Sequence, residues 1–267
     1  MSRLPQVFAR AQKAGRKVLV IYLTAGDPDY ETSARLIGAA IDAGADIVEV
    51  GVPWSDPSAD GPAIQAAMHR ALAAGGGLGR ALALTRAVRE AHPEAGLVLF
   101  GYANPIVVMG AEVFALKARD AGADAVLCVD YPPDEDSRLT LALARQGLDF
   151  IPLLAPTSTA PRIAAAAAAA GGFIYYVSLT GITGTALADV SEPRAQVAAI
   201  RKATADRLPV VVGFGIRTPS AAREVATFAD GVVVGSAAVD VVRKAVEAKR
   251  DPVPELATFV RSLRAAV

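Results

Sequence analysis

The chain has few of the residues that disulfide, thiol and metal chemistry require. Its 267 residues include one cysteine, Cys128, and two histidines, His69 and His92. A single cysteine cannot form a disulfide within the chain; this fits a reducing compartment, and we expect a cytoplasmic protein. Both histidines lie outside the predicted strand ends, so we expect no metal site and no histidine general base.

Neither sign of charge is in excess, since 27 Lys plus Arg residues balance 27 Asp plus Glu residues. Such a balance offers no basic surface to nucleic acid and no cationic face to a membrane. No run of about 18 apolar residues is present, which excludes a membrane span. The polar, helix-like stretch Met1–Gly15 does not resemble a cleaved leader. With 53% hydrophobic residues the chain can bury a large core, so disorder is excluded as well.

Eight short apolar runs recur along the chain. Each is nearly continuous in apolar residues rather than alternating, as expected for parallel strands that are buried on both faces. The predicted strands are Val18–Leu23, Ile47–Val50, Leu97–Phe100, Ala125–Val129, Phe150–Leu154, Phe173–Ser178, Val210–Val212 and Val232–Val234. Helical spacing predicts connecting helices over Tyr30–Ala43, Gly79–Ala91, Ala111–Ala121, Ser137–Gln146, Ala160–Ala170, Ser191–Ala203 and Ser220–Thr227.

Strands and helices that alternate in this way favour a closed (β/α)8 TIM barrel over an open doubly wound sheet. We expect one domain, residues 1–267. An extra helix, Leu4–Ala14, would precede the first strand and plug the bottom of the barrel. An insertion from Pro53 to about Gly77 would follow the second strand. The near copies Ala43–Ile47 and Ala121–Ala125 predict repeated helix-to-strand turns, in which Gly ends the helix and Asp leads into the strand.

The second strand carries a carboxylate at the end of the barrel where catalysis occurs in this fold. Glu49 interrupts the apolar run Ile47–Val52, and a buried carboxylate is costly unless it is protonated, paired or catalytic. It would either line the mouth of the barrel or pair with an Arg or Lys of a helix. Asp56 and Asp60 follow among turn-forming residues, and spacing alone favours turn and capping roles for both.

Glycine turns follow the seventh and eighth strands, at Gly213–Ile216 and Gly235–Ala237. Backbone N–H groups in such turns can hold a phosphate, and this position is a recurring phosphate site in TIM barrels. Tight strand-to-helix turns are the alternative interpretation. The segment Leu179–Asp189 is a candidate lid. Of Tyr175 and Tyr176, at most one can point into the barrel.

Other absences narrow the chemistry. No Lys lies within or just after a predicted strand, which argues against a Schiff base. Cys128 lies in the middle of a strand, where an inert buried thiol is expected. Thr24–Pro28 stands where a dinucleotide fingerprint would follow the first strand. Acid/base chemistry by carboxylates, on a phosphorylated substrate and without a cofactor, is what remains.

The motifs resemble those of the tryptophan synthase alpha chain family along essentially the whole chain. The most specific is Glu49-Val-Gly-Val-Pro-Trp-Ser-Asp-Pro-Ser-Ala-Asp60-Gly-Pro62, which continues into Ile64-Gln65 and His69–Leu72. Further matches are Thr24–Pro28, Gly101–Ile106, Asp130–Pro133, Leu154–Thr157, Gly181–Gly184, Gly213–Ile216 and Gly235–Ala237.

The resemblance implies reversible retro-aldol cleavage of 1-C-(indol-3-yl)glycerol 3-phosphate to indole and glyceraldehyde 3-phosphate. Glu49 would be the acid/base, and Asp60 would accept the indole N–H. Tyr175 would pack near the substrate and orient Glu49. The remaining substrate-binding residues would be Tyr22, Phe100, Leu127, Leu153 and Phe214 around the indole, Gly184, Gly215, Gly235 and Ser236 at the phosphate, and Thr183.

The resemblance also implies a partner, the tryptophan synthase beta chain, which carries pyridoxal phosphate and receives the indole in an α2β2 tetramer. No cofactor is expected in this chain. The sequence departs from the family at Tyr22 and Trp54, where Phe is common, and in Thr185–Asp189, which lacks the basic residue of some members. Two alternatives stay open: another phosphate-binding barrel, such as a phosphosugar isomerase or indole-glycerol-phosphate synthase, and a non-catalytic partner of a beta-type chain.

Overall fold

The computed structural model describes residues 1–132, 136–177, 190–213 and 215–267. Its strands are β1 (Val18–Thr24), β2 (Ile47–Gly51), β3 (Gly96–Gly101), β4 (Ala125–Cys128), β5 (Asp149–Phe150), β6 (Leu153–Leu154), β7 (Ile174–Val177), β8 (Val210–Gly213) and β9 (Gly231–Val234). Its helices are α1 (Leu4–Lys13), α2 (Tyr30–Asp42), α3 (Pro62–Ala73), α4 (Leu78–Ala91), α5 (Ala103–Met109), α6 (Ala111–Asp120), α7 (Arg138–Arg145), α8 (Ala160–Ala169), α9 (Ser191–Thr204), α10 (Pro219–Ala226), α11 (Ser236–Glu247) and α12 (Pro252–Arg264).

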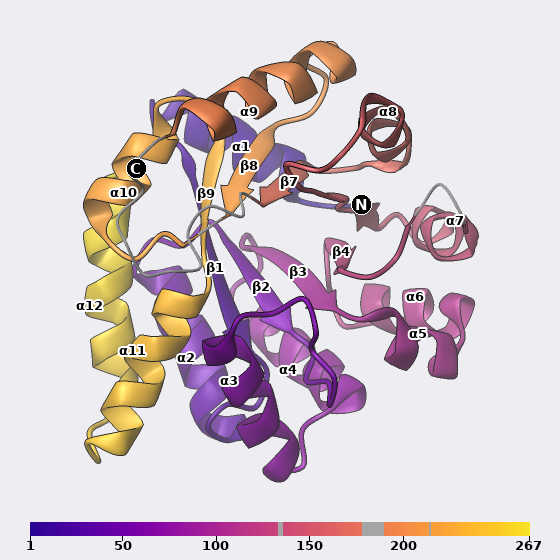
Figure 1. Ribbon diagram of the computed structural model, residues 1–267. Coiled ribbons are helices and arrows are strands. Elements are labelled where there is room, and N and C mark those ends of the chain that lie inside the picture. Colours follow the sequence, from indigo (N-terminus) through magenta and orange to yellow (C-terminus); the bar gives the residue numbers. More distant parts are fainter. Residues whose placement is uncertain (133–135, 178–189, 214) are drawn as a thin grey trace.

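The strands form one parallel sheet that closes into a barrel, with helices around it (Figure 1). Neighbouring strands follow the order β5-β4-β3-β2-β1-β9-β8-β7-β6. The two ends of this order are consecutive in sequence. The N–H of Ile151 donates to the carbonyl of Val126 at 2.9 Å, and the N–H of Tyr175 donates to the carbonyl of Pro152 at 3.1 Å. The predicted (β/α)8 barrel is confirmed, but its fifth strand is split into β5 and β6 because Pro152 has no N–H to donate.

The pairing of strands decides which side chains point inward, because residues paired across a sheet face the same side. Tyr22 of β1 pairs with Glu49 of β2, and Glu49 pairs with Val98 of β3. Tyr22 and Val98 belong to the buried cluster inside the barrel. Their chain neighbours Ile21 and Leu97 belong to the larger cluster between strands and helices. Glu49 therefore points into the barrel.

Helix α1 plugs the barrel at the N-terminal ends of the strands, as predicted. Leu4 and Val7 are buried in the interior cluster. A Cβ added to Gly96, at the start of β3, would lie 3.1 Å from the Leu4 side chain. The ring centroids of Phe8, on the same helix, and Phe173 lie 5.8 Å apart.

The insertion after β2 consists of a loop and helix α3, which was not predicted. The helices α5, α11 and α12 were also missed, whereas the seven predicted connecting helices are all present, with each end within one residue of its predicted position. The buried residues of α3, Ile64, Ala67, Met68 and Ala71, follow a helical period, and Pro62 stands at its start. This signal predicts a helix within the insertion.

Aspartates that precede β2, β4 and β9 tie neighbouring strands together. Each accepts the N–H of a residue on an adjacent strand and an arginine of an outer helix, and this accounts for the Asp in the repeated turns. The groups are Asp46 with Leu19 and Arg264, Asp124 with Leu97 and Arg89, and Asp230 with Val210 and Arg201; each carboxylate-to-backbone distance is 2.9 Å.

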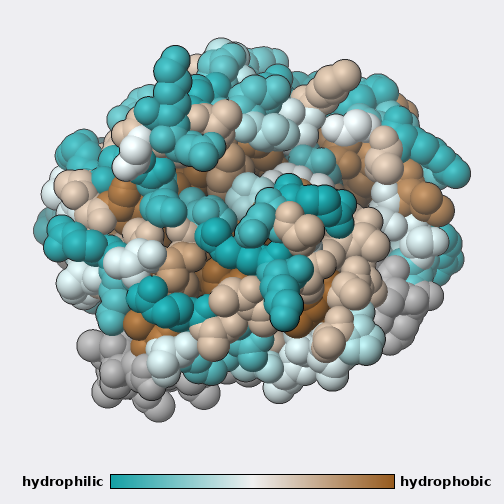
Figure 2. All heavy atoms as spheres, turned by 90° about the horizontal axis from the view of Figure 1, so that it is seen from above, coloured by the Kyte–Doolittle hydropathy of each residue, from teal (hydrophilic) through white to brown (hydrophobic). Residues whose placement is uncertain are grey.

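The outer surface is mixed in character. On the face shown in Figure 2, hydrophilic side chains are interspersed with smaller hydrophobic areas. Two neighbouring valines of α5 are unusually exposed, with Val107 at 69% and Val108 at 81%. Among the described helices, none is long and apolar enough to cross a membrane.

Candidate active site

Glu49 is buried inside the barrel, and no described residue forms a hydrogen bond or ion pair with it. Its side chain is 1% exposed, and Oε1 has no hydrogen-bond donor within reach. Since no described Arg or Lys pairs with it, the alternative of an ion pair with a helix is wrong. Burial, and then the negative charge of Asp60, raise the pKa of Glu49 to about 8. The carboxyl group therefore carries a proton at neutral pH and can give it up at small cost.

The two aspartates of the loop after β2 have different surroundings. Asp56 accepts the hydroxyl of Ser55 at 2.8 Å on the surface, as expected for a turn residue. The Oδ2 of Asp60 instead accepts the hydroxyl of Tyr102 at 2.7 Å. Burial raises the pKa of Asp60 to about 6, and the hydrogen bond from Tyr102 works against that rise. Spacing favoured a turn role for Asp60, but the structure also places its carboxylate in the site, against Tyr102.

Two residues that hold this loop were not among the predicted site residues. Tyr102 follows β3, is 3% exposed and belongs to the interior cluster. Its hydroxyl also accepts the N–H of Ala59 at 3.1 Å. Gln65 on α3 donates to the carbonyl of Asp60 at 2.8 Å. Tyr102 lies at a strand end, in the motif Gly101–Ile106, and its position could have marked it as a candidate.

The predicted indole-pocket residues that the structure describes lie together. Tyr22, Phe100, Leu127 and Tyr175 are members of the interior cluster, and the partly buried Leu153 packs against it. The rings of Tyr22 and Phe100 meet edge to face with centroids 5.1 Å apart. These side chains and Glu49 share one compartment, with apolar walls suited to an aromatic ring. Phe214, the other residue predicted here, lies outside the described residues.

Tyr175 points into the barrel and Tyr176 points away from it, as the alternation of a strand requires. The Tyr175 ring lies over Gly213, where an added Cβ would come within 2.1 Å of the hydroxyl oxygen. Tyr176 donates to Glu192 at 2.7 Å in the outer layer. No hydrogen bond joins Tyr175 to Glu49, so any orienting effect of Tyr175 on Glu49 does not come from a hydrogen bond.

The predicted phosphate-binding turns adjoin the loop of Asp60. Gly235 precedes the first turn of α11, and Gly215 has a positive φ of 50°. A Cβ added to Gly61 would lie 4.0 Å from the Oγ of Ser236, so the starts of α3 and α11 are close together. Thr183 and Gly184, and the candidate lid Leu179–Asp189, lie outside the described residues.

The described N–H groups at the start of α11 have no acceptor among the described residues. No side chain caps α11, and its first N–H groups, those of Ser236, Ala237 and Ala238, have no intrahelical acceptor. Arg217, which follows the β8 turn, is paired with Asp240 at 2.5 Å. An anion held here would therefore be bound by backbone N–H groups and the helix dipole rather than by Arg217, in line with the sequence interpretation.

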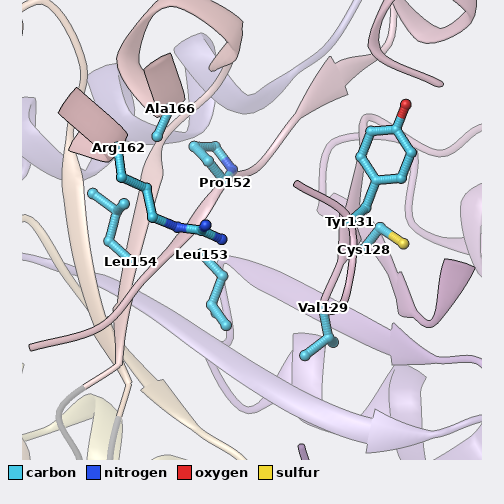
Figure 3. Close-up of a pocket in the computed structure, with 8 residues that line it drawn as sticks. All are labelled: Cys128, Val129, Tyr131, Pro152, Leu153, Leu154, Arg162 and Ala166. Atoms are coloured by element: carbon cyan, nitrogen blue, oxygen red, sulfur yellow. The ribbon is translucent and has the colours of Figure 1, made fainter. Parts of the chain in front are cut away.

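A small cavity lies beside the pocket, near the ends of β4 and β6 (Figure 3). Arg162 extends from α8 toward Leu153, and Cys128 and Tyr131 lie on the other side. Neither Glu49 nor Asp60 lines it. Burial, followed by the charge of Asp130, raises the pKa of the Cys128 thiol well above its usual range. The thiol is buried, as predicted, but Cys128 is the last residue of β4 and not a mid-strand residue; a raised thiol pKa disfavours the nucleophilic thiolate.

The two histidines lie away from the strand ends, as predicted. His69 is on α3, with Nε2 3.4 Å from the carbonyl of Ser55, and His92 follows α4 with Nδ1 3.7 Å from Asp42. Within the described ranges no group of three or more His, Cys, Asp or Glu residues could hold a metal ion.

Comparisons with known proteins agree with the motifs. Residues 8–267 match the family model described as tryptophan synthase alpha chain. Proteins named tryptophan synthase alpha chain from Burkholderia thailandensis and Zymomonas mobilis are 49% and 44% identical; each alignment covers all of this chain and 97% of the relative. The solved tryptophan synthase alpha subunit of Legionella pneumophila superposes with a TM-score of 0.93 at 38% identity and covers 100% and 98% of the two chains. A Mycobacterium tuberculosis tryptophan synthase structure superposes with a TM-score of 0.90 at 35% identity, again covering 100% and 98%. The chain belongs to the tryptophan synthase alpha chain family and is a lyase.

Proposed function

We propose that the chain catalyses the reversible cleavage of 1-C-(indol-3-yl)glycerol 3-phosphate to indole and glyceraldehyde 3-phosphate, and that residues 1–267 work as one catalytic domain in the cytoplasm. The observation that carries the proposal is the carboxyl group of Glu49, which is buried in the barrel with no partner among the described residues and has a pKa of about 8. A group of this kind can give and take a proton near neutral pH.

Cleavage of the carbon–carbon bond needs two proton transfers, and Glu49 can serve both in turn. Its carboxyl group donates a proton to C3 of the indole, which makes the ring an indolenine leaving group. The resulting carboxylate takes the proton of the hydroxyl on the carbon bonded to C3. The O–H electrons form the aldehyde C=O, and the electrons of the broken bond return to the ring as indole forms.

Asp60 is proposed to stabilise the positive charge that develops on the ring. Its pKa of about 6 leaves it mostly ionised at neutral pH. As a carboxylate it would accept the indole N–H, which becomes more acidic when C3 is protonated. The different pKa values of Glu49 and Asp60 support one proton donor and one anion in the same site.

The substrate is proposed to lie between the apolar compartment and the start of α11. Tyr22, Phe100, Leu127, Leu153 and Tyr175 would surround the indole. The N–H groups of Ser236 to Ala238, which have no acceptor among the described residues, and the turns at Gly215 and Gly235 support binding of the phosphate at a helix N-terminus. The family motif assigns Gly184 to the phosphate, Phe214 to the indole pocket and Thr183 to substrate binding.

We further propose that the product indole passes to a beta-chain partner in an α2β2 tetramer. Pyridoxal phosphate would belong to that partner, and this chain would act without a cofactor of its own. The exposed pair Val107 and Val108 supports this proposal, since it offers apolar surface that a partner could cover. They follow β3, on the same side of the barrel as the loop of Asp60.

Indole release from indole-glycerol phosphate tests the function. Wild-type chain is assayed alone and with a beta chain, and Glu49→Gln is assayed alongside it. Glu49→Gln keeps the size of the side chain but cannot exchange a proton, so cleavage should fall at least about 10²-fold. Retention of most of the activity by Glu49→Gln would remove Glu49 as the acid/base. A wild-type chain that binds the ester but releases no indole even with the beta chain would favour a binding module instead.

A further inference from the structure

The hydroxyl of Tyr102 makes two hydrogen bonds, and both reach the loop that carries Asp60. It accepts the N–H of Ala59 at 3.1 Å and lies 2.7 Å from Oδ2 of Asp60. A backbone N–H can only donate, so the phenol oxygen is the acceptor from Ala59. Its single proton is then directed at Asp60. The contact therefore favours Asp60 as an ionised acceptor.

Tyr102 is held by the barrel rather than by the loop. The side chain is 3% exposed and packs in the interior cluster. It directly follows Gly101, the last residue of β3, whose carbonyl accepts the N–H of Val129 at 2.9 Å. Because the strand end is hydrogen-bonded into the sheet and the side chain is buried, the hydroxyl anchors the loop to the barrel.

The contacts of Asp60 leave one carboxylate oxygen available. The side-chain amide of Gln65 donates to the backbone carbonyl of Asp60 at 2.8 Å, and the backbone N–H of Asp60 donates to the carbonyl of Pro57 at 3.0 Å. Tyr102 occupies Oδ2, while Oδ1 accepts no hydrogen bond from any described residue. Both the backbone and one side of the carboxylate are thus fixed, and the other side can meet a ligand.

The ionisable groups around Asp60 come from several elements. Glu49 of β2, Tyr22 of β1 and Tyr175 of β7 each feel its charge, and Asp130 acts on Tyr102. None of these groups is a cation. Burial raises the pKa of Asp60, and the hydrogen bond from Tyr102 is what opposes it. Loss of that bond should therefore leave more of Asp60 protonated at neutral pH.

On the basis of the function proposed above, we propose that Tyr102 is a positioning residue that holds Asp60 by Oδ2 and so presents Oδ1 to the indole N–H. Tyr102 itself transfers no proton. The hydroxyl of Tyr102 acts only by holding Asp60 in place.

Tyr102→Phe tests this inference, with Tyr131→Phe as the matched control. Tyr131 follows β4, the next strand, and its hydroxyl accepts the N–H of Leu139 at 3.1 Å. Like Tyr102 it therefore accepts a backbone N–H, but it does not contact Asp60. In Tyr102→Phe, kcat/KM for cleavage should fall about ten- to one-hundred-fold at pH 7, and the acidic limb of the pH profile should move to higher pH. Tyr131→Phe should leave both unchanged.

Two further measurements separate positioning from a purely structural tether through Ala59. Carboxyl 13C NMR without substrate should show the pKa of Asp60 raised by about one unit in Tyr102→Phe. In an Asp60→Asn background, Tyr102→Phe should cause no further loss of kcat, because the residue acts through Asp60. Replacing Tyr102 by 3,5-difluorotyrosine keeps the ring and strengthens the donor, so it should lower the pKa of Asp60.

An unchanged Asp60 pKa in both Tyr102 variants, or a full additional loss in the Asp60→Asn background, would overturn the inference. The NMR titration does not need turnover. If the wild-type chain fails to cleave the ester, the proposed function fails, while the titration still decides whether Tyr102 controls Asp60.

Discussion

Glu49 and Tyr22 lie side by side on β2 and β1, paired in the parallel register and both directed into the barrel. Burial, together with the charges of Asp60 and Glu49, keeps the pKa of Tyr22 well above its usual range. The phenol therefore stays neutral beside a carboxyl group that is itself protonated at neutral pH. At neutral pH the side chains of Glu49 and Tyr22 are therefore both neutral, and of the three groups Asp60 is the anion.

Glu49→Gln is expected to stabilise the fold more as pH rises. The pKa of Glu49 is raised from 4.5 to about 8 on folding, so the stability this group contributes below pH 4.5 is lost as pH rises towards 8. At about 1.4 kcal/mol per pKa unit, the loss amounts to several kcal/mol. Asp60 acts with the same sign between 3.8 and about 6. Urea unfolding of both proteins across this range measures the difference in free energy of unfolding, which should grow with pH; a constant difference contradicts the raised pKa.

Tyr22→Phe should separate the role of the ring from that of the hydroxyl. The hydroxyl lies 3.2 Å from Oγ1 of Thr24, and its loss should reduce the free energy of unfolding by about 1 kcal/mol. The edge-to-face contact with Phe100 is kept, so indole release should stay within a few-fold of wild type. Tyr22→Ala removes the wall of the pocket and should raise KM strongly. Equal losses of activity in both variants would show that the hydroxyl, not the ring, matters.

Gly213→Ala should disrupt the site through Tyr175. The new Cβ would come within 2.1 Å of the Tyr175 hydroxyl and 2.5 Å of its ring, so the tyrosine must leave the mouth of the barrel. Cleavage should fall at least tenfold, and stability should fall by about 1–3 kcal/mol. Gly79→Ala on α4 is the control, because its Cβ would meet no atom within 4 Å; it should keep activity and gain up to about 1 kcal/mol. Steady-state kinetics and thermal unfolding of the two variants provide the comparison.

Asp124→Ala should destabilise the barrel without altering the site. Its buried carboxylate accepts the N–H of Leu97 at 2.9 Å and pairs with Arg89 at 2.6 Å, and removal leaves that arginine partly buried and unpaired. We expect a loss of about 3–5 kcal/mol. Asp251→Ala removes an exposed cap that accepts the N–H of Val253 at 3.1 Å and should cost only about 1 kcal/mol. Denaturant unfolding measures both, and similar losses would contradict the role of Asp124.

Val108→Asp should weaken the response to a beta chain and leave the isolated chain unaffected. Val108 is 81% exposed, so a charged side chain there disturbs no core, but it would place a charge in an apolar interface. Val246→Asp on α11 is the control at another exposed valine. Indole release is titrated with beta chain for each variant. An unchanged titration for Val108→Asp would place the interface elsewhere.

The local sequence was enough to predict the strands, most connecting helices and the barrel. Continuous apolar runs that alternate with helical segments are compatible with few folds other than a parallel α/β barrel. The Gly-Ala-Asp turns depend only on residues next to one another in the sequence. The motif around Glu49 and Asp60 was likewise visible in one stretch of chain. The insertion helix α3 was missed although its apolar period was present, so that error lay in the interpretation and not in the information available.

Tertiary structure decided the direction of Glu49, the partner of Asp60 and the closure of the barrel. A strand alternates with a period of two, but its phase relative to the barrel axis follows from its neighbours, so Glu49 could equally have faced a helix until Tyr22 and Val98 were placed beside it. The hydrogen bond from Tyr102 joins residues 42 positions apart, which no local pattern encodes. The pKa of about 8 for Glu49 arises from burial among side chains of several strands, because desolvation depends on everything that surrounds a group and not on its place in the sequence.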